Sequence, residues 1–155
     1  MNVDRKQIPV SCGRLLRLCI LSAVLAACVS PAFDYGDYVN KASGSLDAAI
    51  SEIETTRITL QAVQGDRIFS TSADVTISGS EDAMGSIVGT FSAVQPPPSA
   101  DDVQARTSHL LDVAQEAVTD SRIAVRRGDP SQIDDALQLV MHVSGELQDY
   151  GEQLK

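Results

Sequence analysis

Two side chains near the end of the chain have the types and the spacing of a metal-binding pair. His142 and Glu146 are four residues apart, so on a helix they share one face. Imidazole and carboxylate groups both bind zinc, but a catalytic zinc site uses three protein ligands and a structural one four. On the preceding helical stretch, Glu116 and Asp112 are expected near the level of this pair, whereas His109 lies about 10 Å too far along at about 1.5 Å per residue. A metal or small-ligand site between these two stretches is therefore one hypothesis.

The sequence contains none of the motifs that we recognise for other catalytic or metal-binding chemistry. No Ser, Thr or Asp lies in a nucleophile motif, and there is no glycine-rich phosphate loop. The three cysteines are Cys12, Cys19 and Cys28, so the residues after Cys28 can form neither a disulfide framework nor a cysteine-based metal site. The paired Glu-x-x-His motif of di-iron bundles is also missing. We therefore expect a protein that is not an enzyme and that carries no cofactor.

The first 27 residues have the layout of a secretory signal. Four basic residues in positions 1–17 precede an apolar stretch that begins at Leu18 and ends in the small pair Ala26-Ala27. Pro31 limits the apolar run, which is shorter than the about 20 residues that a membrane-spanning helix requires. We expect an exported chain rather than one that spans the membrane through this segment.

The four residues Leu25-Ala26-Ala27-Cys28 resemble the lipobox of bacterial lipoproteins. The resemblance implies cleavage before Cys28, diacylglyceryl lipid on its sulfur, and anchoring on the outer side of a cell membrane or outer membrane. Two or three acyl chains suffice for stable anchoring, whereas one does not. The resemblance divides the chain into a signal peptide (1–27), a short lipidated tether (28–34) and a domain (35–155). It is confined to the leader and its cysteine, and it implies nothing about the fold of that domain.

The residues from Cys28 onward are strongly acidic. They contain 8 basic and 20 acidic residues, which gives a formal charge of −12. Such a charge repels nucleic acids and anionic lipid headgroups. We therefore expect no nucleic-acid partner, and contact with the membrane only through the lipid on Cys28.

Apolar residues recur at helical spacing in four segments of the domain. The predicted segments are 35–64, 67–94, a third from about Ser99 to residue 127, and a fourth from Asp129-Pro130 onward. Gly65 and Gly128 end the first and third helices, three prolines (96–98) end the second, and Ser99 with Asp102 predicts a capping box for the third. Residues 67–79 are rich in small polar and β-branched side chains and also fit a strand, but unbroken seven-residue rows favour one helix. Short connections between similar helices predict an all-α, antiparallel up-and-down four-helix bundle.

The second segment carries an uncharged stretch with small residues four apart. Gly85, Gly89 and Ala93 have this spacing, and no charged residue lies between positions 83 and 100. Small residues so spaced permit close helix packing inside the bundle, or they form a docking face together with Ser86 and Thr90. The main hypothesis is that the domain binds a protein or other envelope component there, near the membrane; the metal or small-ligand site is the alternative.

The predicted topology also sorts residues between the two ends of the bundle. Most aromatic residues are expected at the end nearest the tether, either as an exposed cluster or as a plug of the core: Phe33, Tyr35, Tyr38, Phe91 and Tyr150. The opposite end would hold Arg67, Arg126 and Arg127, either as a binding site for an anionic group or as compensation for helix carbonyl groups.

Overall fold

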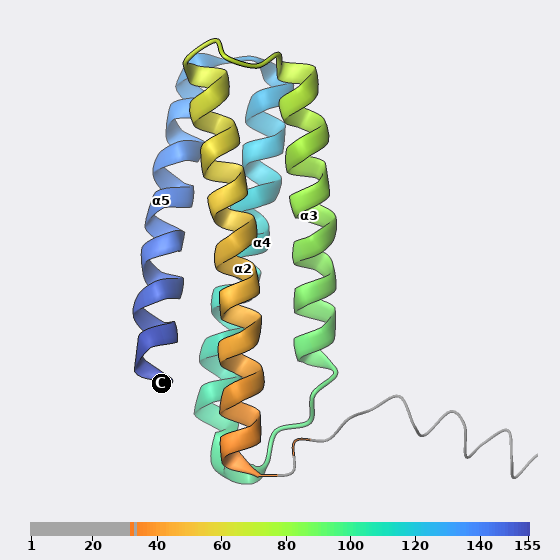
Figure 1. The fold of residues 1–155 in the computed structure, drawn as a ribbon, viewed down its shortest axis with the longest axis vertical. Helices are drawn as coiled ribbons and strands as arrows, with labels where there is room; N and C mark the ends of the chain where they lie inside the picture. The colour runs from red at the N-terminus through yellow and green to blue at the C-terminus, as the bar shows by residue number, and fades with distance from the viewer. Residues whose placement is uncertain (1–31, 33) are drawn as a thin grey trace, which may run out of the picture. The chain divides into compact units, whose positions relative to one another are not determined.

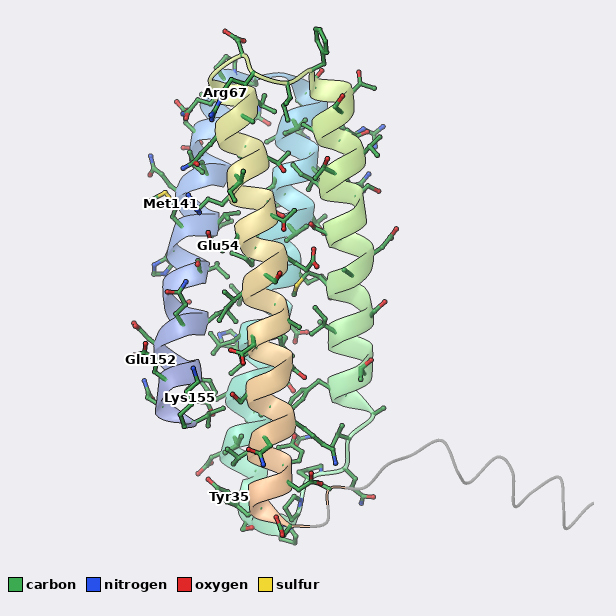
Figure 2. All side chains as sticks on the ribbon, viewed as in Figure 1. Tyr35, Glu54, Arg67, Met141, Glu152 and Lys155 are labelled. Atoms are coloured by element: carbon green, nitrogen blue, oxygen red, sulfur yellow. The ribbon has the colours of Figure 1, made fainter. Side chains whose placement is uncertain are left out.

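The protein is described by a computed structural model, which covers Ala32 and residues 34–155. These residues form four α-helices and one short 3-10 helix: α2 (Tyr35–Gln64), α3 (Ser70–Ser92), η2 (Pro98–Ala100), α4 (Asp101–Arg127) and α5 (Pro130–Gln153). Successive helices run in opposite directions (Figure 1), so the predicted antiparallel up-and-down bundle is confirmed. Tyr35 and Arg67 lie at opposite ends of it (Figure 2), and we name the ends of the bundle the Tyr35 end and the Arg67 end.

The boundaries of α2 and α5 follow from capping groups in the sequence. The Asp34 side chain accepts a hydrogen bond from the backbone N–H of Asp37 at the start of α2. The Asp129 side chain does the same for Ser131 at the start of α5, directly before Pro130. Gly128 ends α4 in the left-handed conformation, with φ of 64°. These caps satisfy backbone groups that a helix end would otherwise leave unpaired.

α3 is a single helix through the residues that also fitted a strand. Hydroxyl groups on its surface donate to the carbonyl oxygen four residues earlier, as Thr76 does to Ser72 at 3.0 Å. Buried Ala73 and Ile77 fix the helix to the core. It begins at Ser70 rather than at residue 67, because the turn after Gly65 places Asp66 at φ of 52° before the chain reverses.

The predicted capping box at the start of α4 is wrong. The N-cap residue is Ala100, and no side chain caps this helix. Instead Pro98–Ala100 forms one 3-10 turn that leads directly into Asp101. Proline suits the start of that turn, because it has the required φ and no amide donor that would need a partner there.

The bundle is compressed along one diagonal. Figure 1 shows α3 and α5 on opposite sides of the pair formed by α2 and α4. α2 and α4 contact each other across the bundle, whereas α3 and α5 make no contact in the described part of the chain. Both close helices carry a row of buried small residues seven apart: Ala42, Ala49 and Thr56 on α2, and Thr107, Ala114 and Ser121 on α4. Because interaxial distance depends on side-chain size at the contact, these rows explain the short diagonal.

Aromatic side chains close the core at the Tyr35 end. The rings of Tyr38 and Phe91 lie 5.8 Å apart and both are buried. Arg106 lies over the ring of Tyr150, 5.8 Å from its centroid. Burial, with Tyr150 adding a smaller effect, raises the pKa of Tyr38. Tyr38 and Phe91 therefore plug the core rather than form an exposed cluster, while Tyr35 is exposed and Phe33 lies outside the described residues.

Candidate functional site

The predicted lipidation site falls outside the described residues. Cys28, the four residues that resemble a lipobox and the predicted signal peptide all lie before Ala32. In the part of the chain that is described, no helix is long and apolar enough to cross a membrane.

The predicted docking residues all lie on the outer surface of α3 and just beyond it. Gly85, Ser86, Gly89, Thr90 and Ala93 are each exposed. A Cβ atom added to Gly89 would meet nothing within 4 Å, and one on Gly85 would meet only the Gln115 side chain at 3.9 Å. These glycines therefore do not provide close packing inside the bundle, which was the other reading of their spacing.

The exposed surface of α3 differs from that of α4 in its charge. Twelve residues of α3 are exposed, and Asp82 is the only ionisable one. On α4, nine of eleven exposed residues are ionisable. Glu81, which lies beside Asp82, is paired with Arg122 of α4 at 2.7 Å. Apart from Asp82, the outer face of α3 is thus a long surface without exposed charges on an acidic domain, and we call it the neutral face of α3.

The structure brings together only two of the predicted metal ligands. His142 Nε2 lies 3.9 Å from Glu146 Oε1, with side chains that are 72% and 41% exposed. Asp112 and Glu116 are exposed on α4. Among the described residues there is no group of three or more His, Cys, Asp or Glu suited to hold a metal ion. The pair therefore has no third ligand among residues 34–155.

A hollow of about 220 Å³ lies between α4 and α5 in the half of the bundle toward the Arg67 end. Its floor consists of Ala124 and Ala136, which are 4% and 6% exposed, because two small side chains face each other there. It is lined by Asp120, Ile123, Ala124 and Arg127 of α4 and by Gln132, Asp135, Ala136 and Leu139 of α5. This hollow was not predicted from the sequence, since both alanines also fit the core rows of their helices.

Hydrogen bonds close one end of this hollow. Arg127 Nη1 donates to Gln132 Oε1 at 3.0 Å, and Gln132 Nε2 donates to Asp129 Oδ2 at 2.9 Å. Hydrogen bonds from the side chain and backbone of Ser131, with a further one from Gln132, lower the pKa of Asp129. Asp129 thus stays charged well below neutral pH and keeps Gln132 and Arg127 in place.

Two of the arginines at the Arg67 end make hydrogen bonds to groups nearby. Arg67 Nη2 donates to the carbonyl oxygen of Gln61 in the last turn of α2, at 3.1 Å. Arg127 is held by Gln132 as described. A second hollow of about 310 Å³ lies under the two turns at this end, lined by Val63, Gln64, Asp66, Ser70, Val125, Gly128, Pro130, Ile133 and Asp134. With two carboxylates in its wall, this hollow offers no cationic site for an anion. Of the three arginines, Arg67 compensates a helix carbonyl group, whereas Arg126 is exposed on α4.

Two half-buried carboxylates join neighbouring helices. Glu54 of α2 accepts hydrogen bonds from Arg57 and from Ser144 of α5, both at 2.8 Å. The bond from Arg57 is the main cause that lowers the pKa of Glu54, against the opposing effect of burial. On the other side of the bundle, Glu81 accepts from Thr119 at 2.8 Å. These contacts join α2 to α5 and α3 to α4.

Comparison with protein-family models, with curated proteins and with solved structures finds no match for this chain.

Proposed function

We propose that this chain is a lipid-anchored lipoprotein of the bacterial cell envelope whose helical bundle is a non-catalytic docking domain for another envelope protein. The lipobox at residues 25–28 supports the anchor. The observation that carries the docking role is the neutral outer face of α3, whose glycines have no packing function.

A helix of the partner protein is the occupant that suits this face best. Positions 85, 89 and 93 form an exposed row of small residues, which we call the track, and a second helix can approach closely along such a row. A neutral surface imposes no electrostatic penalty on a partner with few charges. By contrast, α4 exposes nine ionisable side chains, which favour a partner that carries charges of its own.

Site-specific photocrosslinking in the native membrane tests the docking role. A crosslinker at Ser86 or Thr90 is expected to give one discrete adduct with a single protein. The same crosslinker at Ser51, an exposed position on α2, is the matched control and is expected to give none. Substitution Gly89→Glu should abolish the adduct from Ser86, because it places a charge and a long side chain in the track. The absence of any adduct from Ser86 and Thr90 refutes the docking role.

A separate experiment tests the anchor. Substitution Cys28→Ser removes the sulfur that would carry the lipid, so the protein is expected to retain its leader and to lose the added mass of the acyl chains. Intact-protein mass spectrometry and membrane fractionation measure both effects. A Cys28→Ser protein with unchanged mass and processing would show that Cys28 is not lipidated.

A further inference from the structure

The hollow between α4 and α5 has the size of a site for one side chain. Small-molecule pockets measure about 300–1,000 Å³, and this hollow measures about 220 Å³. Its walls are Ile123 and Leu139, which remain 37% and 36% exposed on either side of the alanine floor. Large apolar side chains that protein partners insert into such pockets commonly dominate the binding energy of an interface.

The rim of the hollow carries negative charge on both sides. Asp120 lies on α4 and Asp135 on α5, and within the described residues neither makes a hydrogen bond or an ion pair. Glu116, one turn from Asp120, is also exposed. The one cation of the lining, Arg127, is held at the closed end by Gln132. The open part of the hollow is therefore an apolar pocket between two carboxylates.

We infer that this groove binds a basic amphipathic helix of another protein, with one large apolar side chain in the hollow and Lys or Arg side chains reaching Asp120 and Asp135. A helix places residues three and four positions apart on one face, so an apolar anchor flanked by basic residues at that spacing matches the groove. A second copy of this acidic chain would bring like charges together, and so would an anionic lipid surface. The basic helix is thus the occupant that charge complementarity selects.

This inference is separate from the docking role of α3. It concerns α4 and α5, so failure of the crosslinks at Ser86 leaves it standing, and its own failure leaves the α3 face unaffected.

Fluorescence anisotropy with the full chain in neutral detergent tests the inference directly. The probe is a labelled 18-residue peptide of Leu and Lys in a helical amphipathic pattern. One comparison peptide replaces every Lys by Glu, and another scrambles the order of the same residues. We expect binding of the first peptide alone. No binding of the Leu–Lys peptide, or equal binding of the scrambled one, overturns the inference.

Matched variants then distinguish binding in the groove from non-specific electrostatic binding to an acidic protein. Leu139→Ser is expected to weaken binding at least fivefold, whereas Ile58→Ser, which changes a 57% exposed residue of α2, should change it less than twofold. The double change Asp120→Asn and Asp135→Asn should weaken binding about tenfold. The same change of charge at Asp101 and Asp102 should have less than a twofold effect.

Three outcomes of these variants count against the groove. Equal weakening by the control and groove variants shows diffuse electrostatic binding. Self-association of the full chain in sedimentation experiments, if Leu139→Ser abolishes it, assigns the groove to a second copy. Flotation with phosphatidylglycerol vesicles that depends on Leu139 assigns it to lipid instead.

Discussion

The short diagonal between α2 and α4 predicts a severe cost for enlarging the small residues along it. Ala49 and Ala114 are fully buried, and they lie at nearly the same level because both helices begin at the Tyr35 end. If space were available, the three added carbons of Ala49→Leu would stabilise the fold by about 2.4 kcal/mol, at about 0.8 kcal/mol for each buried CH₂. Without space, overpacking costs about 1–3 kcal/mol. The two cases differ in sign, so the measurement is decisive.

Urea denaturation followed by circular dichroism measures this effect. We expect Ala49→Leu and Ala114→Leu each to lower the free energy of unfolding by about 1–3 kcal/mol without changing the slope of the transition. Ala48→Leu is the matched control, since the neighbouring residue is exposed, and it should change stability by less than about 0.5 kcal/mol. An Ala49→Leu protein as stable as the control, or more stable, would refute the account of the compressed diagonal.

Two further predictions concern single residues that hold the bundle together. Because its hydrogen bonds lower the pKa of Glu54, its carboxylate stabilises the fold above the unfolded-state value of about 4.5, and this contribution is lost as pH falls through the folded-state pKa. Glu54→Gln should therefore cost about 0.5–1 kcal/mol at pH 7 and progressively less toward pH 3; an equal cost at both pH values in urea titrations contradicts this. Gly128→Ala should destabilise by about 1–2 kcal/mol because φ is positive there. Gly44→Ala within α2 should instead stabilise slightly, and thermal melts that rank the two variants the other way would contradict the left-handed cap.

The sequence was sufficient for the helices because the local signals agreed with one another. Seven-residue apolar rows, Gly65, Gly128 and the prolines at 96–98 all favour the same boundaries, and α2 spans 35–64 as predicted. The predicted capping box of α4 was wrong although Ser99 and Asp102 have the residue types and spacing of that motif. The 3-10 turn that precedes the helix depends on how the proline segment approaches it, which the motif does not describe. The short diagonal was not predicted, since a periodic pattern defines which face is buried but not the distance between two buried faces.

The candidate sites were predictable to different degrees. Small residues four apart suit internal packing as well as docking, so the sequence did not predict whether Gly85, Gly89 and Ala93 are buried or exposed. In the structure they lie on the outer surface. The hollow between α4 and α5 has no linear signature. It arises because Ala124 and Ala136 come to face each other from helices that run in opposite directions, between two larger neighbours.

Substituting the glycines of α3 tests whether they serve the stability of the fold or the binding of a partner. Gly79, Gly85 and Gly89 are exposed within the helix, and added Cβ atoms would meet no close neighbour. Each glycine costs a helix about 0.5–1 kcal/mol relative to alanine, so the triple change to alanine should stabilise the bundle by about 1.5–3 kcal/mol.

If these glycines instead keep the track on α3 open for a partner helix, the same triple change should reduce the photocrosslink from Thr90 at least threefold, although the fold is more stable. Gly145→Ala on α5 is the control that should stabilise the fold without affecting the crosslink. A triple variant that is destabilised would show that the fold itself needs the glycines. A stabilised variant with an undiminished crosslink would remove the glycines from the docking surface.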